Sequence, residues 1–72
     1  MNKLKIQILS VPHKEKLIAE IQNGDYAIAE ISNDKGEFEI ELFSYDDRIE
    51  MSLEEFIDIL YEARTRLSGL SV

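Results

Sequence analysis

The sequence predicts an α+β fold: a four-stranded antiparallel sheet (a meander, β-β-β-β-α) with one C-terminal amphipathic helix packed on one face. Three observations predict it. Residues 37–43 alternate glutamate with apolar residues, the spacing of a half-buried strand. The Asn23-Gly24 dipeptide between two β-prone segments indicates a hairpin. Residues 53–67 carry apolar side chains three and four positions apart, which indicates an amphipathic helix.

The remaining strand boundaries follow from turn residues. Strands are expected at residues 3–9, 17–21, 26–31 and 37–43. Pro12 ends the first strand because proline has no backbone donor for the ladder. Gly36 ends the turn at residues 33–36, where a glycine can take a positive φ.

Two registers are compatible with this pattern. One of them, with an Asn23-Gly24 loop and a bulge at Gly36, buries Tyr26 and Ile28 but leaves Glu30 opposite an apolar residue. The other, without the bulge, buries Ala27, Ala29 and Ile31 against Leu42, Ile40 and Phe38. We favour the first because it buries larger side chains, although a slip of one residue would reverse every assignment.

The helix has recognisable start and stop signals. Ser52 and Glu55 form a capping box, in which the serine hydroxyl accepts a hydrogen bond from the Glu55 amide. Arg64 and Arg66 are expected in the last turns, where positive charge is favourable, and Gly69 is expected to end the helix.

Length and composition limit the class of protein. Seventy-two residues predict a single domain, residues 1–72, with little room for a deep pocket beside its core. The absence of cysteine excludes disulfides and thiolate metal sites. The first ten residues alternate like a strand rather than forming a signal peptide, and no segment has the length of a membrane helix. A cytoplasmic location is therefore expected.

Catalytic and cofactor motifs are not found in the sequence. His13 is the only histidine, and no second histidine or cysteine can join it around zinc, so we expect it to be exposed and inert. The serines lack a Gly-x-Ser-x-Gly context, the glycines do not form a phosphate-binding loop, and residues 33–37 lack the spacing of an EF-hand. We therefore expect no enzyme activity, no cofactor and no bound metal.

The charge distribution points to a protein partner. The net charge is −7, and residues 17–62 carry −12 of local charge while residues 1–16 carry +3. Direct binding to nucleic acid or to an anionic membrane is disfavoured, because both require a basic surface. A basic protein partner fits the charge. The alternative is that the charge only keeps a small protein soluble.

The acidic residues suggest where such a partner would bind. In residues 37–43 the glutamates are expected to face outward at intervals of about 6.6–7 Å, and the apolar residues inward. Acids after the strand and on the helix would extend this surface, together with an exposed tyrosine. The candidate partner-binding residues are Glu37, Glu39, Glu41, Asp46, Asp47, Glu54, Asp58 and Tyr61. The alternative is a solvated strand whose charges prevent aggregation.

Several segments resemble a known family. Residues 11–21, which lead into Ala29-Glu30-Ile31-Ser32, then residues 36–43 and the helix at 53–67, resemble small immunity proteins encoded beside bacterial polymorphic toxins, including those of contact-dependent growth inhibition. The similarity spans about residues 11–68. Related sequences often carry a tryptophan just before Ala-Glu-Ile, where this chain has Ile28.

The resemblance implies a specific function. Such proteins bind one cognate toxin, often a nuclease, and neutralise it by covering its active site or an adjoining surface, without a cofactor. Two other hypotheses remain open. One is an acidic nucleic-acid mimic that inhibits a defence or restriction nuclease, and the other is a structural module that forms a homodimer through a sheet edge.

Overall fold

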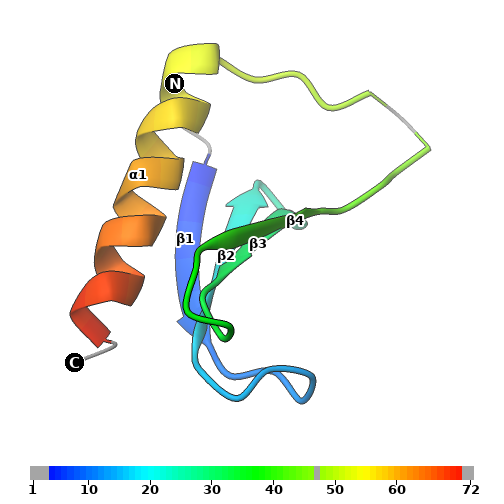
Figure 1. Ribbon diagram of the computed structural model, residues 1–72. Coiled ribbons are helices and arrows are strands. Elements are labelled where there is room, and N and C mark those ends of the chain that lie inside the picture. Colours follow the sequence, from blue (N-terminus) through cyan, green and yellow to red (C-terminus); the bar gives the residue numbers. More distant parts are fainter. Residues whose placement is uncertain (1–3, 47, 71–72) are drawn as a thin grey trace.

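The computed structural model describes residues 4–46 and 48–70. Four strands precede one helix, and their bounds are β1 Leu4–Leu9, β2 Ile18–Asn23, β3 Tyr26–Ser32, β4 Glu39–Leu42 and α1 Leu53–Leu70. The strands form one antiparallel sheet in the order β1-β2-β3-β4, with α1 on one face (Figure 1). The predicted fold class is confirmed.

The helix does not cover the whole sheet. It packs against β1, β2 and β3 and makes no close backbone approach to β4. In Figure 1 the segment between β4 and α1 swings away from the helix before it returns to the helix start. One edge of the sheet is therefore left without a covering layer on the helix side.

The core lies between α1 and the three covered strands. Ile21 of β2 and Leu67 of α1 are almost completely buried. Three alanines, Ala19, Ala29 and Ala63, have no exposed surface at all. Because their side chains are short, the helix backbone can approach β2 and β3 closely, and the larger side chains fill the space around this contact.

The helix side of the sheet carries Ala29 and Ile31, as in the disfavoured alternative, but β4 is shifted by two residues from that register: Ala29 lies opposite Leu42 rather than Ile40. Ile21 pairs with Ala29, and Ile31 pairs with Ile40, so these residues share the helix side of the sheet. Glu30 consequently faces the opposite side. The register that placed Tyr26 in the core is wrong, and Tyr26 is 65% exposed.

Two local features explain the difference. The two-residue loop of the β2–β3 hairpin consists of Gly24 and Asp25, and only Gly24 has a positive φ, of 63°, as in a type II′ turn. The ladder then shifts between Ile21 and Gln22, so Ile28 has no partner of its own on β2. Ile28 still joins the core, next to Ala29.

The other turn agrees with the prediction, and so does the serine half of the predicted capping box. Gly36 has a φ of 88°, and its amide donates to the Asn33 carbonyl at 3.1 Å. The Glu55 amide donates to the Ser52 hydroxyl at 3.3 Å, so Ser52 caps the helix. The helix end differs, because α1 continues through Gly69, whose φ is not positive, to Leu70.

The partial cover of the sheet predicts unequal effects of two matched substitutions. Ile21→Val should lower the free energy of unfolding by about 0.5–1.5 kcal/mol, because it removes a methylene from a fully buried site. Ile40→Val removes the same group from the same face but from the uncovered β4, and should cost less than half as much. Urea denaturation of both variants measures the difference. Equal costs would show that β4 is covered.

Candidate protein-binding surface

Strand β4 is a free edge of the sheet. It pairs with β3 on one side only, and all four of its residues are exposed. Its other side presents backbone N–H and C=O groups that pair with no strand in the described part of the chain. Such an edge is a template for an added strand, and proteins normally block it unless it is used.

The helix side of β4 is apolar. Ile40 and Leu42 point to this side, because they pair with the core residues Ile31 and Ala29. Leu42 is 67% exposed, since α1 does not extend over β4. A buried strand would normally hide such side chains, so their exposure indicates a surface that another molecule can cover.

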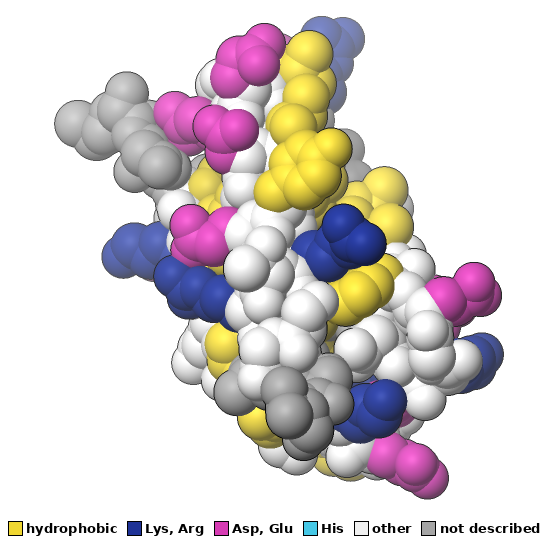
Figure 2. Space-filling model, turned by 60° about the vertical axis from the view of Figure 1, so that its left-hand side comes forward, with side chains coloured by type: hydrophobic (Ala, Val, Ile, Leu, Met, Phe, Trp, Pro, Cys, Tyr) yellow, Lys and Arg dark blue, Asp and Glu magenta, His cyan; other side chains and the backbone are white. Residues whose placement is uncertain are grey.

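The flank of α1 that faces β4 is also apolar. Leu53, Ile57 and Tyr61 recur every four residues, and each is exposed. One turn further along the same flank, the Arg64 guanidinium lies 5.4 Å from the centre of the Phe38 ring. Because Phe38 directly precedes β4, this contact shows that the flank faces β4. Figure 2 shows hydrophobic side chains gathered along one side of α1 and acidic side chains on the other.

These residues define one feature, the β4-side apolar surface. It comprises Phe38, Ile40, Leu42, Leu53, Ile57 and Tyr61. All six are large hydrophobic residues with more than a third of their surface exposed. Of these, the sequence analysis singled out only Tyr61 as a contact residue. The other five were expected in the core. The spacing of apolar residues predicts which side of a strand or helix is apolar, but it does not predict that the helix leaves β4 uncovered.

The segment between β4 and α1 is anchored by a tyrosine. The Tyr45 hydroxyl donates to the carbonyl oxygen of Ala27, and its ring packs edge-to-face against Tyr26 with centroids 5.8 Å apart. An open hollow of about 410 Å³ lies beside this pair, with Ile28 and Ile49 in its lining. The anchor thus holds the segment at the rim of the helix side of the sheet.

The predicted acidic residues do not form one surface. Glu39 and Glu41 lie in β4 and point to the helix-free face. Glu37 is exposed but precedes β4, so it is not part of a three-residue strand stripe. Asp46 is exposed beside the hollow, and Asp47 lies outside the described residues.

The predicted residues on the helix lie together. Glu54 and Asp58 are exposed, and their positions in the helix place them on its outward side, next to Tyr61. Tyr61 is 65% exposed and belongs to the β4-side apolar surface. The structure therefore brings Tyr61 close to two acids and separates them all from Glu39 and Glu41.

The helix-free face carries a group of residues that the sequence analysis did not connect. The Nε2 atom of His13 lies 3.3 Å from Oε2 of Glu30, and Glu30 is only 5% exposed. His13 is exposed as expected, but it contacts a buried carboxylate. The register error hid this contact, because it placed Glu30 on the other side of the sheet.

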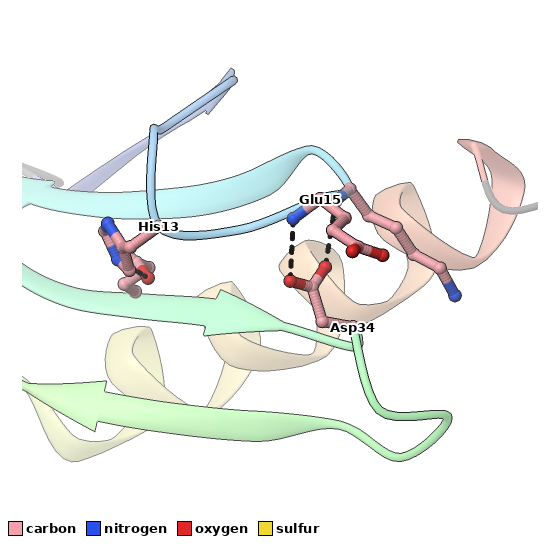
Figure 3. Close-up of polar contacts among 5 residues, drawn as sticks. His13, Glu15 and Asp34 are labelled. Carbon is pink, nitrogen blue, oxygen red and sulfur yellow. Dashed lines mark hydrogen bonds and ion pairs between the residues drawn. The ribbon is translucent and has the colours of Figure 1, made fainter.

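The connection that carries His13 is fixed to the end of β3. The Asp34 carboxylate accepts hydrogen bonds from the backbone amides of Glu15 at 2.8 Å and Lys16 at 2.9 Å (Figure 3). The Lys16 and Glu15 amide hydrogen bonds, in this order, hold the pKa of Asp34 below its ordinary value. This contact folds the connection across β3, where Figure 3 shows His13.

Comparison with protein-family models, with curated proteins and with solved structures finds no match to this chain. Among the described residues, no helix combines the length and the apolar character that a membrane crossing requires. The resemblance to immunity proteins therefore stays a prediction, and the geometry of β4 and α1 is the basis for a functional proposal.

The Asp34 contact predicts a pH-dependent contribution to stability. Since the folded protein lowers the pKa of Asp34, its contribution is fully present above the unfolded pKa of about 3.9 and is lost as the pH falls through the lower, folded value. Asp34→Asn should therefore be less stable than wild type at pH 7, and the difference should shrink below about pH 4. Urea midpoints between pH 7 and pH 2.5 measure this. A difference between the two proteins that stays constant down to pH 2.5 would show that the Asp34 carboxylate does not cause it.

Proposed function

We propose that this chain is an immunity protein that binds a basic bacterial toxin domain, in many cases a nuclease, and neutralises it by protein–protein contact. The observation that supports this proposal most is the free edge of β4, with uncovered apolar side chains on one face and glutamates on the other. The resemblance of residues 11–68 to immunity proteins supplies the class of partner.

The edge favours a partner that adds an extended segment beside β4. Backbone groups of β4 would pair with that segment, and its side chains would alternate between the two faces. Side chains on the helix side would meet Ile40 and Leu42 and should be apolar. Side chains on the other face would meet Glu39 and Glu41 and should be lysine or arginine. This alternation defines the chemistry of the partner segment.

The β4-side apolar surface enlarges the contact beyond one strand. A partner whose strand pairs with the edge of β4 places side chains on the helix side of the sheet. There it also reaches the flank of α1, where Ile57 and Tyr61 are exposed. Tyrosine is enriched among residues that dominate binding energy, because it combines a large apolar ring with a polar end. Glu54 and Asp58 beside it would form an acidic rim that steers a basic partner.

Charge disfavours a second copy of this chain as the occupant. Two β4 strands paired edge to edge would bring their glutamates together on the same face, and like charges that lie opposite each other destabilise a sheet. The net charge of −7 adds repulsion between whole molecules. A basic partner avoids both the repulsion between facing glutamates and the repulsion between whole molecules.

Neutralisation of the toxin domain encoded beside the gene for this chain tests the proposal. Leu42→Lys should weaken binding at least about tenfold and abolish protection in cells, because it places a charge on the apolar side of the edge. Ser10→Lys, an equal change of charge at an exposed position directly after β1, the opposite edge strand, is the control and should bind within about twofold of wild type. Calorimetry measures affinity, and co-expression measures protection.

Three outcomes would contradict this proposal in different ways. If no neighbouring toxin domain binds wild type, the function is wrong. If Leu42→Lys binds as tightly as wild type, the function stands but the contact surface is wrong. If light scattering shows a stable dimer of wild type that Leu42→Lys abolishes, β4 serves self-association instead.

The acidic face of β4 makes a separate prediction. The double variant Glu39→Gln, Glu41→Gln should slow association with the basic toxin domain by about tenfold or more at low salt, with a smaller effect on dissociation, since these charges act mainly by steering. Stopped-flow mixing at two salt concentrations measures the rates. An association rate that is unchanged at low salt would show that these glutamates lie outside the contact.

A further inference from the structure

Three glutamates lie side by side across the helix-free face of the sheet. Glu20 of β2 pairs with Glu30 of β3, and Glu30 pairs with Glu41 of β4. Like charges in directly opposite positions destabilise a sheet. The middle one, Glu30, is only 5% exposed, so water cannot screen its charge effectively.

Lysine and arginine do not neutralise this row in the described part of the chain. The ion pairs found there join Arg66 to Glu62 and His13 to Glu30. Glu20 accepts a hydrogen bond from the Gln22 side-chain amide at 2.8 Å, which accounts for one end of the row. For Glu30, the ion-pair partner found there is the imidazole of His13.

The three side chains converge on one point. One imidazole nitrogen of His13 and one carboxylate oxygen each of Glu30 and Glu41 all lie within 4.8 Å of one another. Metal–ligand distances of about 2.0–2.2 Å require ligand atoms roughly 3.5 Å apart in a tetrahedral site. His13 and Glu41 are exposed and free to rotate by this amount, while burial holds Glu30 in place.

We propose that His13, Glu30 and Glu41 bind a divalent transition-metal ion, with Zn²⁺ as the best fit. An imidazole nitrogen and two carboxylate oxygens suit zinc, whereas Ca²⁺ and Mg²⁺ prefer sites made only of oxygen atoms. The sequence alone does not predict this site, because it offers His13 no second histidine or cysteine, and the two glutamates come close to His13 only in the folded chain. The site shares Glu41 with the acidic face of the proposed toxin contact and lies on the opposite face from Ile40 and Leu42, but its test needs no toxin.

A bound ion would join three segments of the chain. Its ligands come from the connection between β1 and β2, from β3 and from the edge strand β4. It would neutralise the charges of Glu30 and Glu41 and tie the edge strand to the centre of the sheet. Three protein ligands leave a fourth position open to water or to a ligand from another molecule.

Calorimetric titration of the full chain with Zn²⁺ tests the proposal. We expect one ion per chain, and a melting temperature that rises by about 10–20 °C when free zinc reaches about a hundred times its dissociation constant. His13→Ala, Glu30→Gln and Glu41→Gln should each weaken binding at least about tenfold. Glu39→Gln, on the same strand and face, is the matched control and should bind zinc like wild type.

A second measurement separates lost ligands from a damaged fold. Without metal, Glu30→Gln should melt at a higher temperature than wild type, because it removes the middle charge of the row; with zinc, it should melt lower. This reversal cannot arise from general destabilisation.

The proposal is overturned if His13→Ala binds zinc as tightly as wild type, or if Glu39→Gln loses as much affinity as Glu41→Gln. Either result would mean that zinc binds the acidic surface without a defined site. Binding of Mg²⁺ with equal affinity would overturn the assignment to a transition metal.

Discussion

The width of one helix is the constraint on which the rest of this structure depends. A helix with its side chains is about 10–12 Å wide, while strands lie about 4.8 Å apart, so one helix covers roughly two to three strands. The sheet has four strands, and α1 packs on β1, β2 and β3. The apolar face of β4 is therefore left open by geometry. The described residues, 4–46 and 48–70, form no second helix that could cover it.

The order of elements, the turn at Gly36 and the cap at Ser52 could be predicted because local residues determine them. The register could not, because it depends on how closely the helix packs. The choice of the register that buried Tyr26 and Ile28 rested on side-chain size. In the structure the small Ala29 is completely buried, in the same core cluster as Ala63 of the helix. The loop at Gly24 and Asp25 and the shift after Ile21 then complete the register.

The candidate sites were predictable to the extent that they are local. Exposed acids along β4 and beside Tyr61 follow from sequence spacing, and the structure shows them exposed. The contact between His13 and Glu30 does not, because the residues are 17 positions apart and meet only where Asp34 holds the connection against β3. The row of three glutamates depends on the register. An error of register therefore hides both the row and its contact with His13.

The two faces of β4 together make its edge selective. Charged residues on an edge strand normally prevent aggregation, and Glu39 and Glu41 alone would be explained by that role. That role does not explain the other face of β4, where the apolar side chains of Ile40 and Leu42 are exposed. An edge that was only protected would be polar on both faces. In the proposed contact, an edge with glutamates on one face and apolar residues on the other would disfavour a second copy of this chain and favour a segment that alternates basic and apolar residues.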